Sequence, residues 1–152
     1  MNKTLELLAE EIGTKYLPQD AREINPNNSQ CWIAPIIDGD LKENQIYAHG
    51  DIYEMLTDEK AVDIARKAQS SGAIAIFTCG WASPHNPLDS DEDEIAPSKH
   101  PARRRVALML VASPNGDIVT SMRMDSDDLI VNSEGQGYIA EAIDELWQSA
   151  DI

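Results

Sequence analysis

The chain is poor in cysteine, in aromatic residues and in basic residues. Its 152 residues include two cysteines, one phenylalanine, and twelve Lys and Arg against twenty-seven Asp and Glu. Cys31 and Cys79 each lie in an apolar run and form no CxxC pair, so we expect small buried thiols and neither a disulfide framework nor a metal-binding pair. Free thiols favour a reducing, cytoplasmic setting.

The shortage of basic residues gives a formal net charge of −15 at pH 7. Such a charge repels nucleic-acid phosphates and acidic lipid headgroups, so we expect no direct nucleic-acid binding and no membrane association. The sequence has no apolar run near the roughly 20 residues of a membrane span, and its first residues lack the pattern of a signal peptide. The acidic excess fits solubility, or a protein partner with a basic surface.

The hydrophobic pattern predicts a single α+β domain over residues 1–152. Helical spacing predicts helices over residues 3–13, over 49–72 as two helices or one bent helix, and over 139–147, with Gly13 and Gly72 as C-terminal caps. Strands are expected at residues 31–37, 73–79, 105–112 and 118–124, with 129–131 as a brief addition. The order α-β-α-β-β-β-α predicts a mixed, mainly antiparallel sheet of about four strands with helices packed against it.

Three local signals refine this prediction. Pro35 cannot donate a ladder hydrogen bond, which favours an edge or a bulge for residues 31–37. Residues 73–79 are apolar on both faces, so this strand should be central. The turn at residues 114–117 contains Asn-Gly and predicts that residues 105–112 and 118–124 pair antiparallel.

A long charged loop is expected at about residues 82–102, between two buried strands, where function commonly concentrates. Trp81 at its mouth could be an apolar anchor for a protein partner. The acids of the loop complete this candidate partner-binding set: Asp89, Asp91, Glu92, Asp93 and Glu94.

The same loop holds the candidate catalytic residues, with Cys79 as a nucleophile and His85 or His100 as a base. Only His85, Asp89, Asp91, Asp93 and His100 could be considered as metal ligands. We expect no metal, because the spacing matches no zinc pattern and a calcium loop would need glycine at Glu94 and glutamate at His100. No cofactor is expected either, since the chain has no phosphate-cradling glycine loop.

A basic cluster follows the acidic run. Guanidinium groups bind phosphates and carboxylates in a bidentate fork, which makes this cluster a candidate anion site. The alternative, which we favour, is that these residues pair with the acids of the chain's own loop. The candidates are Lys99, Arg103, Arg104, Arg105 and Arg123.

Three segments carry a resemblance: Gly80-Trp81-Ala82, the run Pro97-Ser-Lys-His100-Pro-x-Arg103-Arg-Arg-Val106, and Met122-Arg-Met124. Together they resemble small uncharacterised proteins of actinobacteria and their phages. The resemblance implies a phage or mobile-element setting and no established activity.

The leading hypothesis is a small, acidic, non-enzymatic binding or regulatory protein that acts through a protein partner. The alternative is a small metal-dependent hydrolase or anion-binding enzyme with its site between Trp81 and Arg105. A third hypothesis is a homodimer in which the strand from Cys31 to Ile37 pairs across a two-fold axis.

Overall fold

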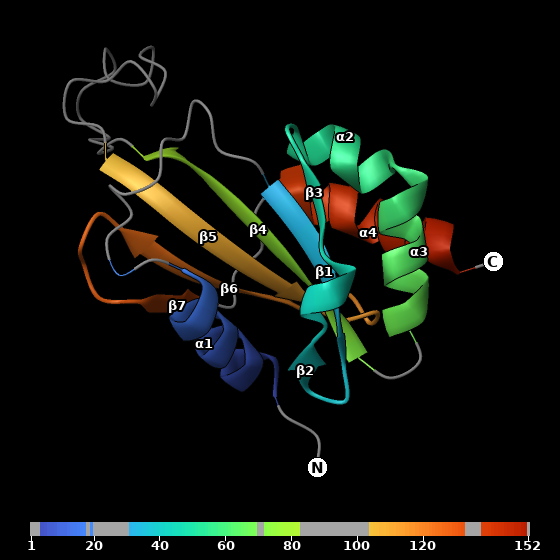
Figure 1. Cartoon of the computed structure of the whole chain (residues 1–152), viewed down its shortest axis with the longest axis horizontal. Coiled ribbons are helices and arrows are strands. Elements are labelled where there is room, and N and C mark those ends of the chain that lie inside the picture. The colour runs from blue at the N-terminus through green and yellow to red at the C-terminus, as the bar shows by residue number, and fades with distance from the viewer. Residues whose placement is uncertain are drawn as a thin grey trace.

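The computed structural model describes residues 4–17, 19, 31–69, 72–82, 104–132 and 138–151. In these residues one antiparallel β-sheet is packed between α-helices (Figure 1). The helices are α1 (Leu5–Tyr16), α2 (Ile52–Thr57), α3 (Glu59–Ala68), α4 (Tyr138–Ala150) and a short 3-10 helix, η2 (Glu43–Gln45). The strands are β1 (Cys31–Ile37), β2 (Asp40–Leu41), β3 (Tyr47–His49), β4 (Gly72–Ala82), β5 (Arg104–Ala112), β6 (Ile118–Met124) and β7 (Ile130–Asn132).

The sheet has seven strands in the order β2-β1-β4-β5-β6-β7, and β3 pairs with β1 beside β2. Every pairing is antiparallel. The α+β class is confirmed, whereas the expected count of about four strands is too low. The main reason is that β2 and β3 are two and three residues long, too short to show a period of two in the sequence.

The central place predicted for residues 73–79 is confirmed, because β4 lies between β1 and β5. Its side chains alternate between two cores. Ile74 and Ile76 belong to the core on the side of α2, α3 and α4, and Ala73 and Ala75 belong to the core on the side of α1. Both faces of the strand are therefore buried, and the molecule has three layers.

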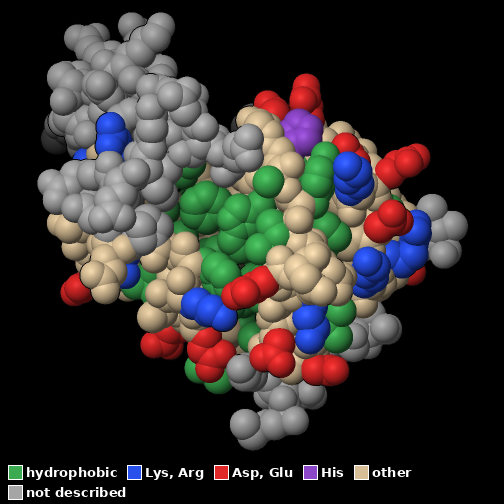
Figure 2. Space-filling model, in the orientation of Figure 1, with side chains coloured by type: hydrophobic (Ala, Val, Ile, Leu, Met, Phe, Trp, Pro, Cys, Tyr) green, Lys and Arg blue, Asp and Glu red, His purple; other side chains and the backbone are tan. Residues whose placement is uncertain are grey.

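One face of the sheet is covered by α1, which contacts β5, β6 and β7. Beside the helix on this face, Trp32 and Phe77 stack with ring centroids 5.8 Å apart, and Tyr16 meets Trp32 edge to face at 5.7 Å. These rings are only half-buried. Figure 2 shows apolar side chains reaching the surface near the middle of this view.

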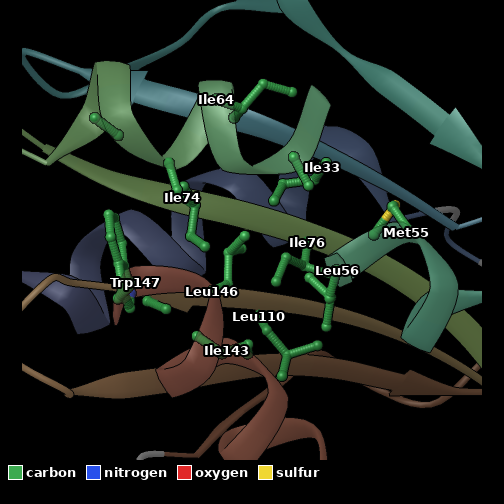
Figure 3. Packing of buried hydrophobic residues seen from close by; sticks show 14 of the residues in the cluster. Ile33, Met55, Leu56, Ile64, Ile74, Ile76, Leu110, Ile143, Leu146 and Trp147 are labelled. Carbon is green, nitrogen blue, oxygen red and sulfur yellow. The ribbon is translucent and has the colours of Figure 1, made fainter. Parts of the chain in front are cut away.

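The opposite face is covered by α2, α3 and α4, with α4 packed against both α2 and α3. Figure 3 shows the large side chains of this layer pointing toward one another from the sheet and the helices. A fully buried Ile or Leu contributes about 1.5–3 kcal/mol relative to exposure, so this is the main core. Its fully buried members include Ile33, Met55, Ile74, Ile76, Leu110, Ile143 and Leu146.

The helical region predicted before residue 72 is confirmed as two helices that meet at Asp58. Asp58 ends α2, and its carboxylate accepts a hydrogen bond from the backbone N–H of Lys60 at 2.9 Å to cap α3. The hydroxyl of Tyr47 donates to the same carboxylate at 3.0 Å. These hydrogen bonds, the one from Lys60 first, lower the pKa of Asp58 below its usual value.

Gly13 does not end the first helix, as the sequence suggested. It lies inside α1 and is buried, and an added Cβ would be 2.4 Å from the Oγ of Ser121 and 2.7 Å from its Cβ. The glycine therefore allows α1 to approach β6 closely, and this packing function has no local signature that differs from a cap.

Gly72 is also not a helix cap, because α3 ends at Ala68 and Gly72 is the first residue of β4. It pairs with Ile37 of β1. A Cβ at this position would overlap the carbonyl oxygen of Ile36, so only glycine allows the two strands to approach as they do.

The strand that contains Pro35 is not at the edge of the sheet, since β1 pairs with β4 on one side and with β2 and β3 on the other. The carbonyl of Pro35 accepts a hydrogen bond from the N–H of Lys42 at 2.9 Å, so its backbone faces the side of β2 and β3. On that side neither Ala34 nor Pro35 has a partner residue in β2 or β3. The missing proline N–H thus falls in a gap between two short strands.

Gly13→Ala should destabilise the protein, because the new methyl group cannot fit between α1 and Ser121. We expect a loss of about 1–3 kcal/mol, typical of overpacking, after the gain in helix propensity is offset. Thermal or urea unfolding measures it. Addition of Ser121→Gly should restore most of the loss, and a stable single variant would contradict the close packing.

Asp58→Asn should make the stability of the protein depend less on pH in the acid range. The pKa of Asp58 is lower in the folded protein than its unfolded value of 3.8. The ionised carboxylate therefore stabilises the fold above pH 3.8, and this stabilisation is lost as the pH falls through the folded pKa. Asparagine still caps a helix but does not titrate. Unfolding midpoints measured between pH 6 and pH 2 should converge for wild type and variant at low pH, and a constant difference over this range would contradict the role of the Asp58 carboxylate.

Candidate functional site

Most residues of the predicted loop site lie outside the described part of the chain. The catalytic, metal and partner-binding predictions on them, and the ordering of the loop at 82–102, stay predictions. These residues are His85, Asp89, Asp91, Glu92, Asp93, Glu94, Lys99, His100 and Arg103.

Cys79 and Trp81 lie in β4, which continues to Ala82, three residues beyond the predicted strand end at residue 79. Cys79 pairs with Ala107 and is a half-buried free thiol, and Trp81 pairs with Arg105. The expected burial of both cysteines is therefore complete for Cys31 and partial for Cys79.

Arg104 is bound internally by two acids of the turn between β6 and β7. Its Nε donates to Asp125 Oδ2 at 2.9 Å, and its guanidinium also pairs with Asp127. These two carboxylates, Asp125 first, raise the pKa of Arg104 above its usual range. Internal pairing thus holds for this arginine with the acids of the β6–β7 turn. The predicted pairing with the acids at 89–94 lies outside the described residues.

The neighbouring arginines are tied to the same turn. The backbone N–H of Arg105 donates to Asp125 Oδ1 at 3.2 Å, and Arg123 Nη1 donates to the carbonyl of Asp127 at 2.6 Å. Arg123 pairs with Ala107, so alternation places Arg105, and not Arg104, on the same face of the sheet as Arg123. These three arginines therefore connect the open end of the β5–β6 hairpin to the turn between β6 and β7.

The described residues include no group of three or more His, Cys, Asp or Glu that could hold a metal ion. The remaining histidine, His49, accepts a hydrogen bond from the N–H of Asp51 at its Nδ1, 3.0 Å away, and lies next to the N-terminus of α2. This contact is a turn interaction at the start of a helix and needs no catalytic explanation.

An open groove of about 380 Å³ lies between α1 and the β1–β2 hairpin. Ile12, Tyr16 and Leu41 form its apolar part. At its rim the carboxylate of Glu43 accepts a hydrogen bond from the hydroxyl of Tyr16 and forms an ion pair with Lys15. These contacts, the hydrogen bond from Tyr16 first, lower the pKa of Glu43. The charges of this groove are thus partly satisfied within the chain.

The described carboxylates are not gathered in one place. Exposed acids lie on all four helices and on the turn between β6 and β7, as in Glu10, Glu54, Asp63, Glu145 and Asp127. Among these residues an acidic cluster is therefore not the feature that marks a binding surface.

Exposed apolar residues are more informative. Among the described residues five large apolar side chains are exposed, and two of them, Ile130 and Val131, are neighbours on β7 with exposures of 45% and 37%. The other three are Leu7, Ile46 and Tyr53, which lie on α1, beside η2 and on α2. Sequence reasoning found the strand but not its place at the end of the sheet, because strand order cannot be read from the apolar pattern.

The strand β7 is the last of the sheet, and no other strand of the described residues pairs with its outer side. Its hydrogen-bonding direction follows from β6. The N–H of Asp125 donates to the carbonyl of Arg105, and the N–H of Ser113 donates to the carbonyl of Asp117. The backbone N–H and carbonyl groups of odd-numbered β6 residues therefore point toward β5, and those of even-numbered residues point toward β7.

The register pairs Met122 with Ile130, Ser121 with Val131 and Thr120 with Asn132. Ile130 and Asn132 therefore bond to β6, and the N–H and carbonyl of Val131 point away from the sheet. Because Ser121 faces α1, Val131 is on the α1 side and Ile130 is on the opposite side. Each face of this edge thus carries one exposed apolar side chain.

Two exposed carboxylates lie near the same edge. Asp128 precedes the strand. Glu10 is one helical turn before Gly13 on α1, and Gly13 faces Ser121 and Leu129. The two apolar side chains of the edge thus have an acidic border formed by Glu10 and Asp128.

Comparison of the chain with family models, with curated proteins and with solved structures finds no match. The resemblance of residues 80–124 to actinobacterial and phage proteins stays a prediction. None of the helices in the described ranges has the length and apolar character needed to cross a membrane.

Arg104→Gln should lower the thermal unfolding midpoint more than Arg66→Gln does. Arg104 bridges two acids that are distant in sequence, whereas Arg66 pairs with Asp63 one helical turn away. The difference between the two variants should shrink when salt is raised from 50 mM to 1 M, because salt screens exposed ion pairs. Equal midpoints at low salt would contradict a structural role for this cluster.

Proposed function

We propose that the protein is a small binding or regulatory protein that acts by docking a protein partner on the β7 edge. The observation that supports this proposal is the pair Ile130 and Val131, two adjacent exposed apolar side chains on a strand whose outer side no other described strand covers. Exposed apolar groups that gather at one place commonly mark interaction sites.

The alternative assignment, a hydrolase or anion-binding enzyme, depends on residues between Trp81 and Arg105. Within that set, Arg104 is paired with Asp125 and Asp127 in the described part of the chain. An anion would have to compete with these carboxylates for Arg104. This competition supports binding through the apolar edge over binding of anions at the arginines.

The proposed partner is another protein, because the net charge of −15 disfavours association between copies of this chain. The same charge favours a partner with a basic surface, since complementary charge accelerates association and rejects wrong partners.

The double variant Ile130→Lys/Val131→Lys should lose partner binding. Both side chains are already exposed, so we expect lysine to change the unfolding midpoint little while it places charge on the apolar edge. The measurement is affinity capture by the tagged chain from cells that naturally contain it, with quantitative mass spectrometry of bound proteins. We expect at least a tenfold loss of a specific protein.

Tyr53→Lys is the matched control, because Tyr53 is 49% exposed on α2, away from β7. It should capture the partner as wild type does. Equal capture by all three proteins, or loss with Tyr53→Lys instead, would contradict the assignment of the binding surface.

A further inference from the structure

We infer that the partner binds by adding an extended segment to β7 as an eighth strand of the sheet, and that this segment carries apolar residues on both faces and lysine or arginine at its ends. The inference rests on the proposed function and gives its mode of binding and the chemistry of the partner.

The backbone of β7 supports strand addition. Val131 directs its N–H and carbonyl outward, as the register with β6 requires. An extended segment beside it would satisfy these groups and continue the ladder of the sheet, which is the usual basis of affinity when a peptide adds to an exposed edge.

The side chains of β7 define the apolar part of the segment. Val131 is exposed on the α1 side of the sheet and Ile130 on the other side. Successive side chains of an added strand alternate between the same two faces. A segment with apolar residues at adjacent positions would therefore contact both side chains, whereas a helix could cover one face only.

The acidic border defines the charged part. Glu10 lies one helical turn before Gly13, which faces Ser121 and Leu129, and Asp128 lies just before the strand. A basic residue on the segment would pair with these exposed carboxylates. A second copy of β7 would instead bring its own Asp128 and its own net charge of −15 to the interface, so the occupant is a different, basic chain.

The test is selection of random twelve-residue peptides on the immobilised full chain, followed by fluorescence anisotropy with the enriched peptides. We expect peptides with adjacent apolar residues and flanking lysine or arginine. Val131→Pro should weaken their binding at least tenfold, because proline removes the outward N–H of Val131 and none of the bonds to β6. Tyr53→Lys should bind them as wild type does.

A second measurement does not depend on folding of the proline variant. Each backbone amide of one enriched peptide is N-methylated in turn. Strand addition predicts an alternating result, in which methylation at every second position weakens binding at least tenfold and methylation between these positions has little effect.

Several outcomes would overturn the inference. They are enrichment of acidic peptides, no enrichment at all, equal binding to wild type and Val131→Pro, or uniform effects of N-methylation. A dimer in sedimentation equilibrium that Val131→Pro dissociates would show that the occupant is a second copy. Partner capture that is lost with Ile130→Lys/Val131→Lys but kept with Val131→Pro would leave the proposed function standing and reject strand addition alone.

Discussion

The fold depends on the burial of β4 on both faces. Ile74 and Ile76 on one face and Ala73 and Ala75 on the other are at most 2% exposed, so the strand must have layers on both sides. The larger residues face α2, α3 and α4, and the alanines face the layer of α1. Gly72 starts this strand where its backbone lies against the carbonyl of Ile36. The position of every other strand follows from pairing outward from this centre.

Pairing outward from β4 produces two different sheet edges. On one side β1 carries the short strands β2 and β3, which share its outer side with η2 between them. On the other side the sheet ends at β7, where Ile130 and Val131 are exposed apolar side chains. Short strands are one way to limit unwanted pairing at an edge, but natural edges are also commonly protected by charge on the strand itself. The charges near β7 lie beside it, on α1 and on the preceding turn, and leave Ile130 and Val131 uncharged on the strand itself.

The arginine cluster and the β7 edge are physically connected. Asp127 and Asp125 hold Arg104, and Asp127 also accepts a hydrogen bond from Arg123 through its carbonyl. These contacts fix the turn that leads into β7. Arginines that the sequence offers as an anion site thus act, in the described structure, to position the strand that we propose as the binding surface.

The sequence predicted the elements that are long enough to show a hydrophobic period. The alternating cores of β4, the Asn-Gly hairpin between β5 and β6, and the apolar stripe of α4 all appear as expected. It did not predict β2 and β3, because two or three residues show no period. It also misassigned Gly13 and Gly72, since a glycine required by close packing with a distant residue looks the same in sequence as one that ends a helix.

The proposed binding surface was harder to predict because it depends on strand order. Residues 129–131 were identified as a brief strand, but only the topology shows that β7 is last in the sheet and that its outward backbone groups belong to Val131. Pro35 shows the same difficulty in reverse. Its missing N–H suggested an edge, whereas the structure places it in an interior strand at a gap between two short neighbours.

Amide hydrogen exchange at β7 in the free protein tests the central claim most directly. If β7 is an available edge, the amide of Val131 should exchange at least about tenfold faster than the amides of Ile130 and Asn132, which bond to β6. Protection of Val131 equal to that of its two neighbours would show that its N–H is already bonded, and would contradict an open binding edge.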